Sequence, residues 1–269
     1  MDKTTGIMGH DVAATETHIA FHSATESKPS HLEPDSLLIP WALSRRQSGL
    51  RVFWQEDAPK PPVMNSRRRA ALVAKRGLDI VGALIGLLVL APLLAITAIC
   101  VKLTDRGPVF FRQTRVGREG KAFEILKFRS MHWDRCDISG VAQTVAKDHR
   151  VTPIGSFIRR TSIDELPQLI NVLTGDMSLV GPRPHVRGML AAGVPYEKLV
   201  PQYDFRHEMR PGLTGWAQCN GLRGPTVDPN KALQRVGHDF AYIQNFSLWL
   251  DAKILLKTIA TELLSSTAH

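Results

Sequence analysis

The sequence predicts a helix-dominated α+β protein that attaches to one face of a membrane. Three observations lead to this fold class. Residues 80–101 form a long uncharged segment that contains a proline, Pro92. The segment after it contains two short runs typical of strands, joined by a turn, as in a β-hairpin. Most of the remaining chain carries apolar residues at helical spacing, which predicts amphipathic helices, some of them at the membrane interface.

Residues 1–64 are expected to form a mostly disordered, hydrophilic leader, and residues 65–269 a single domain. The leader is rich in Ser, Thr, His and Pro and shows no sustained hydrophobic period. It holds six Lys or Arg against eight Asp or Glu, so the excess of positive charge, +9 for the whole chain, lies after residue 64. No charged start is followed at once by an apolar core, which argues against a cleaved signal peptide.

The composition favours some classes of function over others. A basic domain suits an anionic partner, such as nucleic acid, anionic lipid or a phosphorylated substrate. The three cysteines show no CxxC spacing, which is typical of reduced residues and not of a disulfide framework or a zinc site. The chain contains no GxxxxGK[ST], HExxH or GxSxG motif and no GxGxxG motif after a strand. ATP-driven, zinc and dinucleotide chemistry are therefore not predicted.

The apolar segment, residues 78–102, is expected to enter the membrane. Its uncharged part would be about 33 Å long as a straight helix, which is enough to span a bilayer. Basic residues flank it on both sides, within residues 65–77 and from Lys102 to Lys121. A one-way span explains two basic ends poorly, because positive charge favours the cytoplasmic side. With a kink at Pro92, a re-entrant helix is favoured; a kinked span and a buried soluble helix stay open.

The rest of the chain divides into a hairpin, helices and loops. Residues 108–131 predict two strands joined by a turn at residues 117–120. Residues 157–174 predict one helix. Further helices are expected over residues 196–209, 230–246 and 247–264, the last either in the core or at the membrane interface. Residues 210–224 are too rich in Gly and Pro for a helix or a regular strand and predict turns or a binding loop.

Two adjacent acids, Asp164 and Glu165, stand in the stretch "RRTSIDELPQL". A structural interpretation exists for each of them. Ser162 and Glu165 have the S-x-x-E spacing of a capping box, in which the two side chains close the start of a helix. Asp164 would serve equally well as the N-cap, which would leave Pro167 in the first helical turn, where its missing N–H does no harm.

The same stretch also suits phosphate chemistry. At a helix start, free N–H groups and the helix dipole favour an anion, and Arg159 adds positive charge nearby. Asp164, Gln168 and Asn171 recur at i, i+4 and i+7, so one helix would carry them as a polar stripe. A carboxylate facing a phosphate needs its repulsion cancelled, which arginines and a divalent cation can do.

Further cations are candidates for the same pocket, although each could instead be an exposed surface residue. Arg183 lies between two prolines in "GPRP", which stiffen its backbone and would hold its guanidinium ready to clamp a phosphate. Lys127 and Arg129 stand two residues apart in "KFRSM", and a strand would place both on one face.

In this order and spacing, the motifs resemble those of the bacterial sugar transferase family. These are the monotopic polyprenyl-phosphate glycosyl-1-phosphate transferases that begin the assembly of exopolysaccharide, capsule and O-antigen repeat units. The resemblance runs from about Lys75 to the C-terminus. It rests on "KRGLDIVGALIG", "GPVFFRQTRVGREGKAFEILKFRSM", "TPIGSFIRRTSIDELPQLINVLTGDMSLVGPRP", "RPGLTGWAQCNGLRG" and "YIQNFSLWLDAKILLKT".

The resemblance implies a role for each candidate residue. Asp164 would be the nucleophile that attacks the sugar-bearing phosphorus of a UDP-sugar, and an ordinary aspartate pKa near 4 would leave it ionised without tuning. Glu165 would hold Mg²⁺ or handle a proton. Arg159 would bind a phosphate or carboxylate, and Arg183 would lie near the nucleotide or its phosphates. Pro92 would break the re-entrant helix, although Ala91 replaces the small polar residue that often precedes this proline.

The resemblance also implies a reaction and its partners. UMP leaves from a covalent phosphosugar–aspartyl enzyme, and undecaprenyl phosphate then accepts the sugar phosphate at the cytoplasmic face of the bacterial inner membrane. UDP-glucose or UDP-galactose is the expected donor, and Mg²⁺ the expected cofactor. Membrane lipids are expected partners, a homo-oligomer is left open, and nucleic acid is not expected. The competing hypothesis is a membrane-tethered basic adaptor that binds anionic lipid or nucleic acid.

Overall fold

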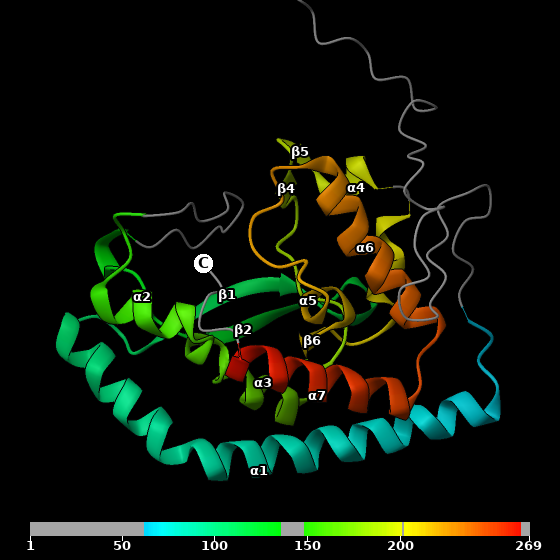
Figure 1. The fold of residues 1–269 in the computed structure, drawn as a ribbon, viewed down its shortest axis with the longest axis horizontal. Helices are drawn as coiled ribbons and strands as arrows, with labels where there is room; N and C mark the ends of the chain where they lie inside the picture. The colour runs from blue at the N-terminus through cyan, green and yellow to red at the C-terminus, as the bar shows by residue number, and fades with distance from the viewer. Residues whose placement is uncertain (1–61, 136–147, 201, 265–269) are drawn as a thin grey trace, which may run out of the picture. The chain divides into compact units, whose positions relative to one another are not determined.

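The computed structural model describes residues 62–135, 148–200 and 202–264 (Figure 1). The expected leader lies almost entirely outside the described residues and stays a prediction. The predicted helix-dominated α+β class is confirmed, with short strands between the helices. In chain order the elements are α1 (Ser66–Thr104), β1 (Phe110–Val116), η3 (Arg118–Gly120), β2 (Ala122–Phe128), η4 (Trp133–Arg135), α2 (Pro153–Arg160), η5 (Ile163–Glu165), α3 (Gln168–Thr174), β3 (Ser178–Val180), β4 (Leu190–Ala191), β5 (Val194–Pro195), α4 (Tyr196–Leu199), η6 (Tyr203–Glu208), β6 (Gly212–Thr214), α5 (Trp216–Cys219), α6 (Pro229–Gln244) and α7 (Leu248–Leu264).

Helix α1 contains the whole apolar segment. It begins at the side chain of Asn65, whose Oδ1 accepts a hydrogen bond from the backbone N–H of Arg68 at 2.8 Å. The helix continues without a break through Pro92, and its axis bends in the half that contains this proline (Figure 1). By length and composition α1 could cross a membrane, and only 11% of its apolar window is buried.

Polar side chains fix the N-terminal half of α1 to the rest of the domain. Lys75 forms a buried ion pair with Asp251 of α7, with 2.6 Å between Nζ and Oδ2. Arg76 donates to two carbonyl oxygens near the end of α3. Asp79 accepts from the Ser178 hydroxyl and from a backbone N–H of β3, both at 3.0 Å. The charged residues of "KRGLDIVGALIG" therefore serve to dock this helix.

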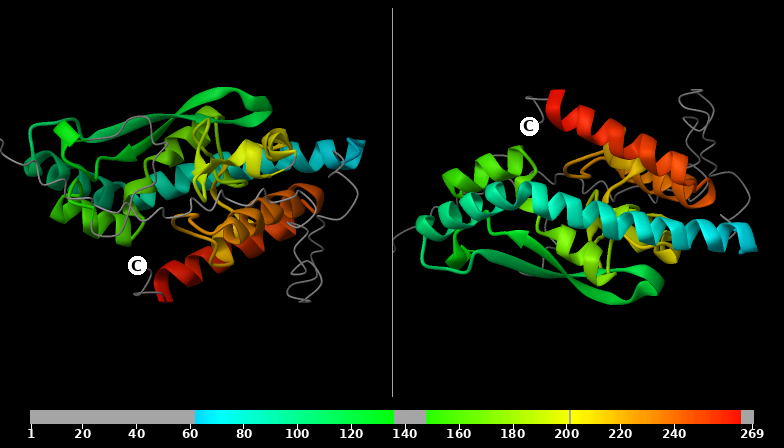
Figure 2. Two further views of the ribbon diagram at one scale, coloured as in Figure 1. Left: turned by 90° about the horizontal axis from the view of Figure 1, so that it is seen from above. Right: turned by 90° about the horizontal axis from the view of Figure 1, so that it is seen from below.

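The C-terminal half of α1 packs against the same domain. Val101 forms a buried apolar cluster with Phe128 of β2 and Ile158 of α2. The carbonyl oxygen of Val101 also accepts from Arg129 at 3.1 Å. In views from above and below, α1 runs between the hairpin and α7 (Figure 2). Both ends of the long helix are thus held by one body.

The predicted hairpin is confirmed. β1 and β2 pair antiparallel, from Phe110 opposite Phe128 to Val116 opposite Ala122. The turn falls where it was predicted, and Glu119 and Gly120 take the left-handed conformation there, with φ of 58° and 72°. Exposed side chains alternate with more buried ones along much of both strands. A strand with this arrangement leaves a local period in the sequence, so the element could be predicted.

The single helix predicted over residues 157–174 is wrong. Ser162 adopts φ 56° and divides this stretch into α2, the short turn η5 and α3. Pro167 lacks the N–H that a continuous helix would need there. The capping interpretations fail as well, because Ser162 makes no side-chain capping bond and Pro167, not Asp164, takes the N-cap position of α3. The acidic pair therefore lies on a tight turn between helices.

A short parallel pairing follows, which corrects the expectation for residues 210–224. β3 pairs with β6, and the loop also contains α5. A Cβ atom on Gly181 would lie 2.3 Å from the carbonyl oxygen of Arg210, so only glycine allows this close approach. The pairing brings two distant glycine-containing segments together, and a search for local periodicity cannot detect it.

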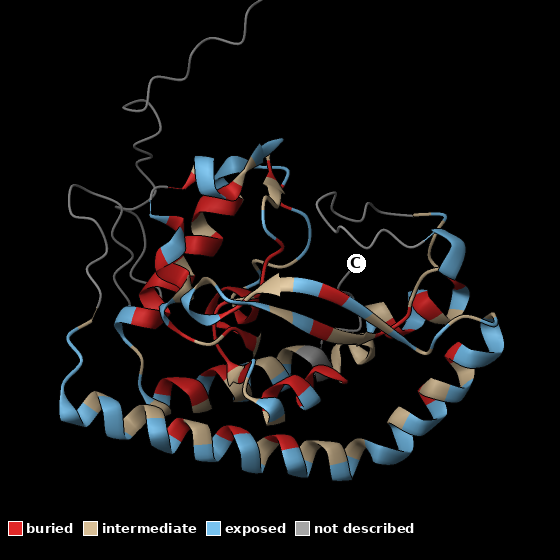
Figure 3. Cartoon of the chain, turned by 180° about the vertical axis from the view of Figure 1, so that it is seen from behind, coloured by how far each residue is buried: buried red, intermediate tan, exposed pale blue. Residues whose placement is uncertain are grey.

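The remaining helices complete the domain. α6 and α7 lie where they were predicted, and α6 is largely buried, in contrast to α1 (Figure 3). The helix predicted over residues 196–209 is divided into α4 and η6. In α7, Leu250 and Ile254 are buried, whereas Trp249 and Leu256 are exposed. The core interpretation of α7 is thus confirmed for one face, and the membrane interface stays a prediction for the exposed apolar face.

Candidate functional site

Glu165 is the centre of a cluster of charges drawn from three parts of the chain. Its Oε1 accepts from Lys127 Nζ of β2 at 2.6 Å and from Arg183 Nη2 of the "GPRP" loop at 2.6 Å. Arg183 Nη1 lies 3.2 Å from Oε2, so the guanidinium meets the carboxylate with both nitrogens. The structure therefore brings together Lys127, Glu165 and Arg183, as the sequence predicted.

A cleft of about 210 Å³ opens beside Glu165. Its walls are Arg115, Ile125, Lys127, Glu165, Gln168, Arg183 and Pro184. Three cationic side chains surround one carboxylate, so the lining carries an excess of positive charge and favours an anion. The charge of this lining suits phosphate groups.

The two neighbouring acids have opposite electrostatic environments. Burial raises the pKa of Asp164 to about 6, the negative charge of Glu165 acts in the same direction, and Lys127 opposes it. Burial alone would also raise the pKa of Glu165, but Arg183 and Lys127 hold it well below its usual range. The expectation that Asp164 needs no tuning is thus corrected, although it is still mostly ionised at pH 7.

This separation assigns different chemistry to the two carboxylates. Glu165 stays charged and is a poor proton acceptor, because protonation would break its contacts with Lys127 and Arg183. Of the two roles that the resemblance implied for Glu165, holding a cation therefore fits better than handling a proton. Of the two carboxylates, Asp164 carries the less stabilised negative charge.

The other predicted residues divide into those near the pair and those engaged elsewhere. Arg159 lies in the last turn of α2, and its positive charge lowers the pKa of Asp164. Arg129 instead forms a buried ion pair with Asp105 at the end of α1. β2 ends at Phe128, so Arg129 no longer shares a strand face with Lys127. Its contacts indicate a structural role.

The predicted polar stripe is also incomplete. Gln168 does line the cleft. Asn171, however, bonds to the backbone of β2: its Oδ1 accepts from the N–H of Leu126 at 2.9 Å, and its Nδ2 donates to the carbonyl of Glu124 at 2.8 Å. Asn171 therefore docks α3 on the hairpin and does not face the cleft.

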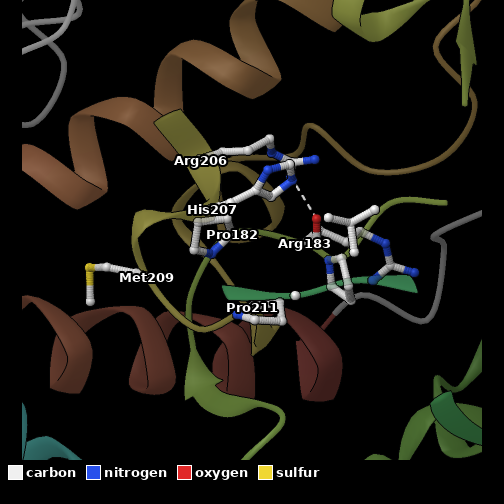
Figure 4. Close-up of a pocket in the computed structure, with 9 residues that line it drawn as sticks. Pro182, Arg183, Arg206, His207, Met209 and Pro211 are labelled. Atoms are coloured by element: carbon white, nitrogen blue, oxygen red, sulfur yellow. Dashed lines mark hydrogen bonds between the residues drawn. The ribbon is translucent and has the colours of Figure 1, made fainter. Parts of the chain in front are cut away.

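A second cleft also borders the "GPRP" loop and includes Arg206 and His207 (Figure 4). Arg206 is buried and directs its guanidinium at the carbonyl oxygen of Arg183, 2.6 Å away (Figure 4). It also pairs with Asp239 of α6 at 2.7 Å. Arg206 thus fixes the backbone that carries the Arg183 side chain.

Sequence reasoning missed both Arg115 and Arg206. Arg115 was counted only as one of several basic residues after the apolar segment, and Arg206 stands in a stretch assigned to an ordinary helix. A signal existed for Arg206, because it is flanked by Phe205 and lies close to other apolar residues that pack in the core. Nothing in the local pattern indicates that Arg115 faces Arg183.

The acidic pair fits a Mg²⁺ ion. The described residues contain no group of three or more His, Cys, Asp or Glu side chains that could hold a metal ion. Mg²⁺, however, often binds one or two carboxylates and takes its other ligands from water and phosphates. A carboxylate oxygen has two lone pairs. Oε1 of Glu165 accepts from both Lys127 and Arg183, whereas Oε2 accepts only from Arg183. Among the hydrogen bonds of the described residues, one lone pair on Oε2 of Glu165 therefore remains open.

Fold and site together define a domain that combines a cleft favouring an anion with a long apolar helix. The chain belongs to the bacterial sugar transferase family, whose model matches residues 70–265. It is 56% identical over 192 residues to the exopolysaccharide production protein PSS of Rhizobium leguminosarum bv. phaseoli, a match that covers 71% of this chain and 96% of the relative.

Two longer relatives carry more specific names. The chain is 48% identical over 195 residues to a UDP-glucose:undecaprenyl-phosphate glucose-1-phosphate transferase of Escherichia coli (strain K12), covering 72% of this chain and 41% of the relative. It is 46% identical over 187 residues to a UDP-N-acetylgalactosamine-undecaprenyl-phosphate N-acetylgalactosaminephosphotransferase of Aeromonas hydrophila, covering 70% of this chain and 43% of the relative. The match thus spans less than half of either longer relative.

Proposed function

We propose that the protein transfers a sugar-1-phosphate from a UDP-sugar to undecaprenyl phosphate, as the first step of exopolysaccharide or capsule repeat-unit assembly. The observation that carries this proposal is the pair of adjacent acids, in which Glu165 lines a cationic cleft and Asp164 keeps a raised pKa beside it in sequence. The relatives' names support the donor and acceptor classes. Glucose or galactose is the proposed sugar.

The proposed chemistry proceeds in two displacements at phosphorus. A carboxylate oxygen of Asp164 forms a bond to the sugar-bearing phosphorus while the bond to the UMP phosphate oxygen breaks, and UMP carries away the electron pair. A phosphate oxygen of undecaprenyl phosphate then attacks the same phosphorus, and Asp164 leaves as the carboxylate. A covalent intermediate explains how one small cleft can serve a water-soluble donor and a lipid acceptor in turn.

The surrounding residues reduce the repulsion between Asp164 and the phosphate. Arg159 and Arg183 both act on Asp164 through their charge, and Arg183 is held in place by its contact with Glu165. Mg²⁺ held by Glu165 would neutralise further phosphate charge. Preorganised cations of this kind supply most of the stabilisation in phosphoryl transfer.

We further propose that α1 lies in the cytoplasmic face of the bacterial inner membrane without crossing it. Its two halves contact one domain, through Lys75 at one end and Val101 at the other. A helix that crossed the bilayer would carry one of these contact regions to the opposite side. The exposed apolar side of α1 and the bend in the half containing Pro92 support this arrangement.

Release of UMP tests the proposed reaction. Full-length protein in detergent, with Mg²⁺ and undecaprenyl phosphate, is offered UDP-glucose, UDP-galactose and UDP-N-acetylgalactosamine. We expect one of them to yield UMP, and Asp164→Asn to lower the rate by about a thousandfold or more, because the nucleophile is lost. Asp134→Asn is the matched control, since Asp134 is an exposed acid on η4.

The covalent step has a separate readout. Without the acceptor, wild-type protein should release about one UMP per chain in a burst, and its Asp164-containing peptide should gain the mass of a sugar phosphate. Absence of UMP with every donor would reject the transferase. Full activity of Asp164→Asn would reject the mechanism, and salt-dependent lipid or nucleic-acid binding without turnover would favour the adaptor.

A further inference from the structure

Arg115 lies in the cationic cleft but belongs to no ion pair there. Its Nη1 donates to the carbonyl of Pro184 at 3.3 Å, and its Nη2 bonds to the side chain of Gln113. Its Nε is buried and has no hydrogen-bond partner among the described residues. Burial and the positive charge of Arg183 lower the pKa of this guanidinium to about 10. An anion beside Arg115 would satisfy the free donor and offset both effects.

Gln168 supplies a second unused donor in the same cleft. It is the first residue of α3, its side chain lines the cleft, and it is only 2% exposed. Its Nε2 is buried without a hydrogen-bond partner in the described structure. A buried donor without a partner destabilises the folded chain, so a group that accepts from Gln168 when the site is loaded explains why the amide is tolerated.

Arg183 connects these two donors to the acidic pair. It lines the same cleft as Arg115 and Gln168, and its Nη2 lies 2.6 Å from Oε1 of Glu165, the neighbour of Asp164 in sequence. Arg183 therefore serves two positions for phosphate, one at the acidic pair and one at Arg115. A diphosphate has two linked phosphates and matches this arrangement.

We propose that Arg115 and Gln168 form a second phosphate subsite, which binds the nucleotide-side phosphate of the donor, the group that departs as UMP. The assignment rests on the proposed function, in which Asp164 attacks the sugar-side phosphorus. Arg115 provides charge from β1, Gln168 provides a neutral N–H donor from α3, and Arg183 bridges the two phosphates.

Two substitutions and one matched control test the subsite. Arg115→Gln removes the charge, and Gln168→Met removes the donor while keeping the length of the side chain. Arg112→Gln removes a charge from the same strand at an exposed position that pairs only with Glu124 at the surface. Loss of a charge-assisted hydrogen bond should raise the donor KM and the inhibition constant of UMP together by about tenfold to a hundredfold for Arg115→Gln, with a smaller rise for Gln168→Met and none for Arg112→Gln.

The two half-reactions distinguish the donor's phosphate from the acceptor's. The burst of UMP without acceptor reports the donor step, and transfer from preformed phosphosugar enzyme to undecaprenyl phosphate reports the acceptor step. We expect the variants to slow the donor step at subsaturating donor and to leave the acceptor step within about twofold. Slowing of the acceptor step alone would overturn the assignment, as would equal loss in both steps with a lowered unfolding temperature.

Direct binding keeps this proposal separate from the proposed function. Calorimetric titration of wild-type protein with UMP and with inorganic pyrophosphate needs no turnover. Weaker binding by the Arg115 and Gln168 variants, but not by Arg112→Gln, would support the subsite even if no UDP-sugar gave UMP. Unchanged binding by both variants would overturn it even if the transferase activity were present. If Arg115→Gln failed to fold, Gln168→Met would decide.

Discussion

The acidic pair shows how one turn gives two identical functional groups different properties. Asp164 and Glu165 are adjacent, yet only Glu165 meets the nitrogens of Lys127 and Arg183 directly. Asp164 lies in the same low-dielectric surroundings without an equivalent pair of contacts, so burial dominates and raises its pKa. The ionised carboxylate of Asp164 therefore destabilises the folded state, whereas that of Glu165 stabilises it. Such perturbed pKa values are typical of reactive sites.

This difference predicts opposite stability effects for two conservative substitutions. The pKa of Asp164 rises from 3.8 to about 6 on folding. The folded state thus binds its proton more tightly, and the penalty for ionisation is absent below about pH 4, grows between pH 4 and 6, and is complete above pH 6. Asp164→Asn should raise the free energy of unfolding at pH 7.5 by about 1–3 kcal/mol, with no gain near pH 4.

Glu165→Gln should act in the other direction. The pKa of Glu165 is lowered on folding, so its carboxylate contributes stability above the unfolded pKa, and that contribution is lost as the pH falls. The substitution leaves Lys127 and Arg183 facing a neutral amide and should destabilise the protein at pH 7.5. Urea denaturation of both variants over pH 4 to 8 measures these effects, and the same sign for both would contradict the assigned electrostatics.

At the scale of elements, predictability followed the range of the interactions. α1, the hairpin, α6 and α7 have apolar periods that are complete within each segment, and all were predicted. The division of residues 157–174 depends on Ser162 in a left-handed conformation, which no period reveals. The β3–β6 pairing joins segments more than thirty residues apart. The cleft depends on that pairing because Arg183 lies in the loop that follows β3.

The acidic pair and its cations could be proposed from sequence because their residue types and spacing resemble a known family. Lys127 and Arg183 were correctly placed together with Glu165. Arg129 was not, because its partner Asp105 lies at the end of α1 and only the folded chain brings them together. Gln168 was predicted to line the site as part of one helix over residues 157–174. That helix is divided in the structure, and Gln168 reaches the cleft from the start of α3.

Two glycines test how the β3–β6 pairing supports the site. A Cβ on Gly181 would meet backbone atoms of Arg210 and Gly212 at 2.3 and 2.8 Å. Gly181→Ala must therefore separate the strands and shift the adjoining Arg183. We expect a loss of about 1–3 kcal/mol of stability and about a hundredfold loss of UMP release at temperatures where the variant is folded.

Gly77→Ala is the matched control for that substitution. Gly77 lies in α1, and a Cβ there would meet nothing within 4 Å. Alanine in a helix interior should stabilise by about 0.5–1 kcal/mol without changing activity. Thermal unfolding and the UMP assay give both readouts, and an unchanged rate for Gly181→Ala would show that the strand pairing does not position Arg183.

At the scale of the whole domain, α1 connects the exposed apolar surface with the candidate site. Asp79 of α1 accepts hydrogen bonds from Ser178 and from the backbone of Leu179 in β3. β3 runs directly into Gly181 and Arg183. The helix that carries the apolar surface thus contacts the strand that leads into Arg183, so we expect a lipid acceptor held at α1 to approach the cleft from a fixed side.

The exposed side of α1 gives the last prediction. Leu88 and Val89 are 76% and 71% exposed and lie near the middle of the apolar segment. A lysine at the centre of a membrane-inserted helix costs about 2.5–3.5 kcal/mol. The double substitution Leu88→Lys, Val89→Lys should therefore move the protein from the membrane pellet to the soluble fraction after cell lysis, while the domain stays folded because neither side chain packs in the core.

Val194→Lys provides the control. Val194 is an apolar residue, 40% exposed, on β5, which lies on the far side of the domain from α1 (Figure 1). A lysine there replaces one exposed apolar residue with a positive charge, as each lysine of the double variant does, without touching the proposed membrane face, so the protein should stay in the pellet. UMP release with a short, water-soluble polyprenyl phosphate should persist in the double variant, because its cleft is unaltered. If the double variant stayed in the pellet as a folded protein, α1 would not be the main membrane contact, and the exposed side of α7 would take its place.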